Sequence, residues 1–227
     1  MTMDHMDHES RAADIDAMQA AYAQTLYSLR ESRKAILAPY AVDDEASLLE
    51  KIRSGDVDEH PAYESYLGAS IIGQARTRVR EQLTRQLSGA AVDVDAGMDA
   101  DIDADIGVHA LLLEGIEAGY AHRLSEPVRV AQDALLVFFD SGLIVEARYF
   151  SADEYAISWS WGEAQLRIDT APVHPQCGSF PHHLHDDSGQ LRADGVTRPG
   201  APCWSNFSSL IDALLIDPLL EPGDEPT

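Results

Sequence analysis

Four of the nine histidines in the chain lie within a short, proline-rich segment, DTAPVHPQCGSFPHHLHDD, at residues 169–187. An imidazole can transfer a proton near neutral pH, and it is also a common ligand of transition metals. Arg167 and Asp169 come just before the histidines in a strand-like stretch, where alternation of side chains places both on one face. The residues that could carry chemistry are therefore Arg167, Asp169, His174, His182, His183 and His185.

One chemistry that these residue types allow is cleavage of RNA without a metal or any other cofactor. An arginine can hold a phosphate in a bidentate grip, and two histidines can serve as base and acid while the 2′-hydroxyl attacks. In this hypothesis Arg167 binds phosphate and one or more of His182, His183 and His185 transfer protons. His174 and Asp169 orient those groups.

Two other interpretations of the segment stay open. His183 and His185 could bind zinc, with His174 or Asp169 as a third ligand, because zinc accepts nitrogen and oxygen donors. The segment could also be a purely structural loop, in which the imidazoles form hydrogen bonds to backbone groups. The sequence alone does not decide between catalysis, metal binding and structure.

Composition narrows the class of protein. The chain has 16 basic and 39 acidic residues, a net charge of −23 and only two lysines, Lys34 and Lys51, which is typical of proteins from salt-loving organisms. Concentrated salt screens charge over about 3 Å, so this acidity does not exclude an anionic partner there.

The sequence contains no P-loop, Rossmann fingerprint, G-x-S-x-G or H-E-x-x-H motif. The acidic start, MTMDHMDHES, is unlike a signal peptide, and no apolar run is long enough to span a membrane, so we expect a cytoplasmic protein without a membrane partner.

The pattern of apolar residues divides the chain into three parts. Residues 1–88 predict two long amphipathic helices, at 14–37 and 61–87, joined by a short helix near 45–53. Residues 89–106 contain six aspartates and no basic residue, which indicates an acidic linker. Because a helical hairpin with one apolar seam needs a further surface, we expect the helices to pack on the rest of the chain or on a second copy.

Residues 107–227 predict an α+β domain. Four stretches with a two-residue period, at 134–139, 143–150, 154–161 and 164–169, predict a four-stranded antiparallel meander with turns at Gly142 and Gly162. Residues 126–131 could add a strand, and helices are expected at 108–118 and 205–217. The closing helix would be capped by Ser205 or Ser208.

The segment LRIDTAPVHPQCGSFPHHLHDD resembles the signature of TumE-like toxins of prokaryotic toxin–antitoxin modules. In that family a strand with Arg-x-Asp-x-Ala-Pro leads to His-Pro and then to Phe-Pro-His-His-x-His. Val173 and Leu184 stand where the family pattern has a histidine and a lysine. The resemblance covers residues 107–217, and the matching residues are Arg167, Asp169, Ala171, Pro172, His174, Pro175, Phe180, Pro181, His182, His183 and His185.

This resemblance implies at best a RelE/ParE-like α+β fold and does not identify the target. Together with the chemistry of the histidine segment, it leads to the hypothesis of a toxin domain that cleaves RNA or blocks translation, with RNA or the ribosome as partner. The stretch SLLEKIRSGDVDEHPAYESYL, residues 47–67, is similar to small helical proteins encoded beside such toxins. The chain would then join an antitoxin-like helical segment to a toxin-like domain and neutralise itself, or associate through its N-terminal helices. The alternative is a non-catalytic regulatory or scaffold protein that binds a protein partner.

Overall fold

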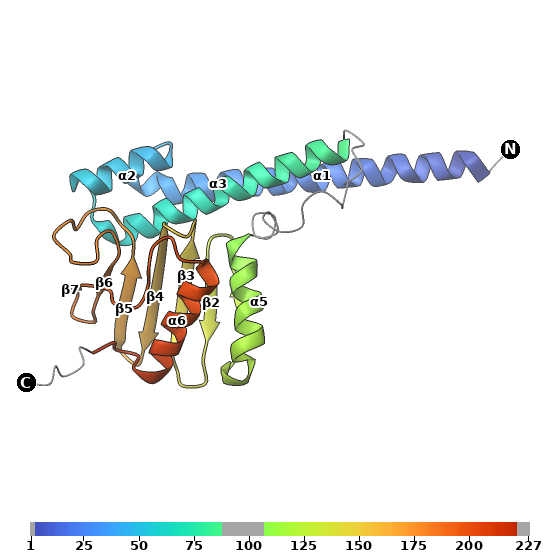
Figure 1. Ribbon diagram of the computed structural model, residues 1–227. Helices are drawn as coiled ribbons and strands as arrows, with labels where there is room; N and C mark the ends of the chain where they lie inside the picture. The colour runs from blue at the N-terminus through green and yellow to red at the C-terminus, as the bar shows by residue number, and fades with distance from the viewer. Residues whose placement is uncertain (1–2, 88–106, 222–227) are drawn as a thin grey trace, which may run out of the picture.

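The protein combines a helical N-terminal part with an antiparallel sheet that carries its own helices, which confirms the predicted α+β class (Figure 1). The computed structural model describes residues 3–87 and 107–221, with side chains from residue 16 onward. The predicted linker at 89–106 lies outside the described residues, so the division into domains stays a prediction. Within the described residues, no helix has the length and apolar character that a membrane span requires.

Three helices form the N-terminal part. The two long ones, α1 (Met3–Leu37) and α3 (Glu59–Leu87), lie side by side, and α2 (Glu45–Ser54) connects them after the 3₁₀ turn η1 (Ala38–Tyr40) (Figure 1). The carboxylate of Asp44 accepts a 2.8 Å hydrogen bond from the backbone N–H of Ser47 and caps α2. The predicted hairpin is therefore present, although α1 begins well before residue 14.

In the described part of the chain the sheet contains seven strands in sequence order, each antiparallel to its neighbours. The predicted four-stranded meander corresponds to β2 through β5, and the stretch at 126–131 supplies β1. Two further short strands were not predicted. One lies in the histidine-rich segment and pairs with β5, and the other follows that segment and pairs with the first. The strands are β1 (Arg129–Val130), β2 (Leu135–Phe138), β3 (Ile144–Tyr149), β4 (Tyr155–Trp161), β5 (Ala164–Asp169), β6 (His183–His185) and β7 (Leu191–Arg192).

Two helices, α5 (Val108–Tyr120) and α6 (Cys203–Ile216), pack on one face of the sheet and form the larger apolar core (Figure 1). The 3₁₀ turn η2 (Ala121–Arg123) follows α5. Residue Pro202 precedes α6, and no side chain caps that helix. The predicted serine caps are therefore wrong, because the helix begins at Cys203, before Ser205 and Ser208.

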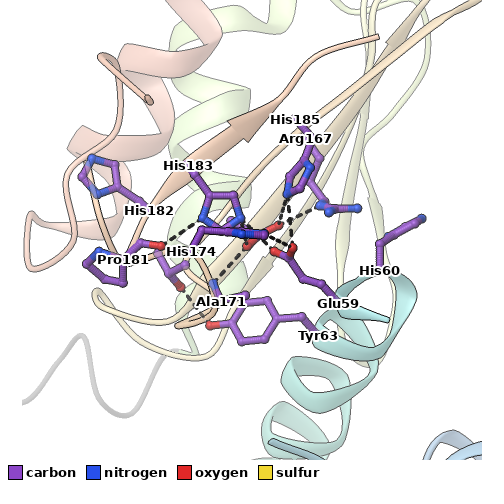
Figure 2. A network of polar contacts seen from close by, with 12 residues as sticks. Glu59, His60, Tyr63, Arg167, Ala171, His174, Pro181, His182, His183 and His185 are labelled. Atoms are coloured by element: carbon purple, nitrogen blue, oxygen red, sulfur yellow. Dashed lines mark hydrogen bonds and ion pairs between the residues drawn. The ribbon is translucent and has the colours of Figure 1, made fainter. Parts of the chain in front are cut away.

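The N-terminal helices of residues 3–87 (the helical segment) pack on the sheet and its helices, residues 107–221 (the sheet domain), and not only on one another. A second apolar core joins Leu48, Tyr63 and Leu67 of the helices to Ala156 and Ala171 of the sheet domain. This packing supplies the further surface that the predicted hairpin needed. It also brings the first turn of α3 next to β5 and β6, the strands that carry the histidine-rich segment (Figure 2).

Candidate functional site

Strand pairing brings the candidate residues to one place. Strands β5 and β6 are antiparallel neighbours in which Arg167 pairs with His185 and Asp169 pairs with His183. Because residues two apart share a face of a strand, all four of these side chains lie on the same face of the sheet. This is the face opposite to α5 and α6, and it is the face that receives the first turn of α3 (Figure 2).

Glu59, the first residue of α3, lies at the centre of the site (Figure 2). One carboxylate oxygen, Oε1, is 2.8 Å from His183 Nε2. The other, Oε2, is 2.7 Å from His174 Nε2 and 3.4 Å from His185 Nε2. A single carboxylate of the helical segment thus contacts three imidazoles of the sheet domain.

Arg167 belongs to a buried ion network next to the histidines. Its Nε donates a 2.7 Å hydrogen bond to Asp169 Oδ2, and its Nη1 lies 3.4 Å from Glu64 Oε1 on α3. The Arg167 side chain is only 11% exposed. Both acidic partners hold the guanidinium in place, and one of them comes from the helical segment.

Asp169 is almost completely buried and connects the strand to the histidines. Its carboxylate accepts hydrogen bonds from Arg167 and from the backbone N–H of Ala171, and Oδ1 lies 3.3 Å from His183 Nε2. Burial, followed by repulsion from Glu59, raises the pKa of Asp169 to about 6. Its negative form therefore depends on the positive groups around it.

The other ionisable groups of the site respond to the same surroundings. Burial alone would raise the pKa of Glu59, but its contacts with His183, His185 and His174 outweigh burial and hold that pKa well below the usual range. Burial alone would lower the pKa of His183, but the contact with Glu59 and the charge of Asp169 raise it overall. The site therefore favours a negative carboxylate surrounded by imidazoles.

His182 lies outside this group, although the sequence placed it among the candidates. Its ring points away from the cluster (Figure 2), and its buried Nδ1 has no hydrogen-bond partner among the described residues. The cause is the two-residue alternation of β6 and the residues before it, which sends His183 and His185 to one face and His182 to the other.

Sequence reasoning missed the contribution of the helical segment. Glu59 and Glu64 reach the site from α3, and no local motif marks either of them as part of it. Two tyrosines of the same helix secure the contact: Tyr63 hydroxyl bonds to Thr170 Oγ1 at 2.9 Å, and Tyr66 hydroxyl donates to Glu154 at 2.8 Å. The site is therefore shared between two segments that are far apart in the sequence.

A cleft of about 720 Å³ opens beside the site on the same face of the sheet. Arg167, His185 and Glu59 border it, while Ser158, Ser160 and Gln165 contribute polar groups from β4 and β5. Four other acidic residues also line it: Asp58, Glu146, Asp186 and Asp187. The part of the site that a ligand could reach is therefore polar and, with Glu59 in place, predominantly negative.

Residues 1–91 match a family described as the uncharacterized protein MJ0235 family. The match covers the helical segment, including Glu59 and Glu64, and does not reach the strands that carry the histidines. No curated protein and no solved structure matches the chain. The resemblance of residues 107–217 to TumE-like toxins therefore stays a prediction.

Proposed function

We propose that residues 107–227 form a TumE-like toxin domain that cleaves RNA or blocks translation, and that the helical segment neutralises this domain in the same chain. The observation that supports the proposal is the position of Glu59. Its carboxylate contacts His174, His183 and His185, which all belong to the signature segment of the toxin-like domain.

The groups around the site have the chemistry that a phosphodiester requires. A phosphate needs positive and hydrogen-bonding partners, and Arg167 with the neighbouring imidazoles provides them. In this proposal Arg167 binds the phosphate, and the imidazole cluster activates the attacking or the leaving group. Arg167 and His185 border the cleft and so lie where a substrate could reach them.

The carboxylates of the helical segment take the place of that phosphate. Glu59 contacts the imidazoles, and Glu64 lies 3.4 Å from the Arg167 guanidinium. These two groups neutralise the partners that a phosphate would use, and the acidic border of the cleft repels a polyanion. We therefore expect the full chain to be inactive until Glu59 leaves the histidines.

The proposal is tested by expressing full-length variants in a host cell and measuring growth and the incorporation of labelled amino acids. Glu59→Gln keeps the size of the side chain and removes its charge, so we expect growth arrest that the wild type does not cause. Asp58→Asn is the matched control, because Asp58 is adjacent to Glu59 and also borders the cleft but is outside the histidine contacts. Adding Arg167→Gln to Glu59→Gln should relieve the arrest.

Growth of the Glu59→Gln strain at the wild-type rate, with the soluble variant present in normal amount, would contradict the proposal. The scaffold alternative would then be favoured, since it assigns the site a role in stability without an activity. The length of cellular RNA separates the two proposed activities. Shortened RNA indicates cleavage, whereas intact RNA with arrested incorporation of amino acids indicates a block of translation.

A further inference from the structure

The side chains that meet at Glu59 have the arrangement of a metal centre. One ligand atom from each of Glu59, His174, His183 and His185 can be chosen so that all four lie within 4.8 Å of one another. The three rings do not stack: their planes meet at 89°, 65° and 70°, with centroids 4.7, 5.9 and 4.9 Å apart. Nε2 of each ring lies next to the Glu59 carboxylate (Figure 2).

The contacts of His183 direct Nε2 at the Glu59 carboxylate and Nδ1 at the backbone. Its Nδ1 lies 3.1 Å from the backbone oxygen of Pro181, so Nδ1–H donates to that carbonyl. Nε2 faces Glu59 Oε1 at 2.8 Å, and a metal ion would take the place of the proton that this contact requires. Metal-binding histidines show this arrangement, in which the second ring nitrogen is fixed by a carbonyl or carboxylate.

The unpartnered ring nitrogen of His185 is a second observation that points to a cation. Its Nε2 is buried and has no hydrogen-bond partner among the described residues, although it lies 3.4 Å from Glu59 Oε2 and 4.0 Å from Asp169 Oδ2. Buried polar atoms are nearly always satisfied in native proteins. A cation between the three Nε2 atoms and the carboxylate would satisfy this atom together with the others.

Charge also favours a cation at this point. In the absence of a metal, each contact between an imidazole and the Glu59 carboxylate requires its own Nε2–H proton. A divalent ion attracts all four donors at once. Three nitrogens and one carboxylate oxygen suit zinc, which is bound tetrahedrally by such donors, whereas magnesium and calcium prefer oxygen ligands.

We infer that the chain binds one divalent transition-metal ion of the zinc class through Nε2 of His174, His183 and His185 and a carboxylate oxygen of Glu59. Asp169 lies behind the ligands and supports His183 and Arg167. The metal would join the two parts of the chain, since one ligand comes from α3 and three from the sheet domain. The inference changes the proposed role of these three rings, because an Nε2 bound to a metal cannot also exchange a proton, but it does not depend on which reaction the domain performs.

One consequence rests on the proposed function. Catalytic zinc sites use three protein ligands and leave the fourth position for water or substrate, whereas four protein ligands close a site. Glu59 would occupy that fourth position and so block the reaction while it completes the centre. The same residue would then act as a ligand and as the inhibitor.

The test measures metal on the full-length protein purified with a tag that lacks histidine. Elemental analysis should find about one zinc per chain, since ordered structural or catalytic zinc stays bound at that level. His185→Asn and His174→Asn should each lower the zinc content at least about tenfold, as expected when one ligand of a metal site is removed. Both rings are partly exposed, and circular dichroism of the two variants shows whether either change unfolds the chain.

Two control variants separate this centre from other histidines. His182→Asn changes a neighbouring ring that points away from the cluster and should retain the metal. A double variant, His5→Ala with His8→Ala, removes histidines near the N-terminus and should also retain it. After exchange of zinc for cobalt(II), the wild type should show visible absorption bands, and Glu59→Gln should shift them.

Less than about a tenth of an ion per chain in the wild type after incubation with excess zinc would overturn the inference, because a built site saturates under these conditions. So would equal loss of metal from His182→Asn and His185→Asn. Metal content is measured on purified protein and growth arrest in cells. A bound ion without arrest by Glu59→Gln therefore removes the toxin function alone, and arrest without a bound ion removes the metal centre alone.

Discussion

His183 and Glu59 are 124 positions apart in the sequence, yet His183 Nε2 lies 2.8 Å from Glu59 Oε1. The contact joins a residue of β6 to the first residue of α3, and both side chains are largely withdrawn from solvent. The site therefore exists only while the helical segment is docked. Changes to the docking surface should alter the site even where they touch none of its histidines.

The hydroxyl contact between Tyr63 and Thr170 provides a test of docking. Tyr63→Phe removes a buried hydrogen bond while it keeps the ring that packs in the second core. We expect a loss of about 1 kcal/mol in the free energy of unfolding, the usual contribution of such a bond. Chemical denaturation measures it. Tyr27→Phe is the matched control, because Tyr27 is 57% exposed and should change stability by less than about 0.5 kcal/mol.

Two glycines of α5 make a matched pair for the packing of that helix. A Cβ on Gly115 would lie 2.4 Å from Cε3 of Trp204, a rigid ring on α6, so Gly115→Ala should destabilise the protein by about 1–3 kcal/mol. A Cβ on Gly119 would meet nothing within 4 Å. Gly119→Ala should therefore be neutral or stabilising by up to about 1 kcal/mol, because alanine favours a helix. Thermal unfolding of both variants compares them, and equal losses would show that α5 and α6 do not pack as described.

Asp169 tests the buried ion network. Asp169→Ala removes the acceptor of the Arg167 Nε–H and of the Ala171 N–H, and leaves Glu64 at 3.4 Å as the remaining acidic partner of the guanidinium among the described residues. Breaking a buried pair from one side costs about 3–5 kcal/mol, so we expect a loss in that range on chemical denaturation. Asp187→Ala, at an exposed position of the same segment, should change stability by less than about 0.5 kcal/mol. Similar values for the two variants would mean that the Asp169 network does not contribute to stability.

Local patterns predicted most of the secondary structure. The spacing of apolar residues identified α3, and the two-residue period identified β2 through β5, because both signals depend on neighbours in the sequence. Strands β6 and β7 were missed, since three and two residues are too short to show a period. Their formation depends on the pairing of β6 with β5 and of β7 with β6, which no local pattern reports.

Local sequence patterns also indicated some residues of the site and missed those that tertiary packing brings to it. The run of histidines indicated the right segment, and His174, His183 and His185 converge as the metal and catalytic hypotheses both required. His182 was included because spacing alone does not show which face of a short strand a residue takes. Glu59 and Glu64 were missed because their contacts arise from tertiary packing of α3 on the sheet.

The lowered pKa of His109 should make the free energy of unfolding depend on pH. Its Nε2 accepts a 3.2 Å hydrogen bond from the backbone N–H of Tyr149, which only the unprotonated nitrogen can do. Burial lowers the pKa of His109 to about 4, with Asp133 opposing and Arg148 adding to this effect. In the unfolded chain the pKa is about 6.5, so between pH 6.5 and about 4 the unfolded state binds more protons and stability falls as the pH falls.

His109→Gln isolates this contribution, because the glutamine oxygen can still accept a hydrogen bond but the side chain does not titrate. The variant will have a different stability at pH 7, where His109 is neutral in both states. The informative quantity is the change in the difference between the two proteins with pH. We expect the wild type to lose stability relative to His109→Gln as the pH falls from 7 to 4, measured as the midpoint of denaturation in matched buffers. Parallel curves for the two proteins would show that His109 takes up its proton equally well in the folded and unfolded states.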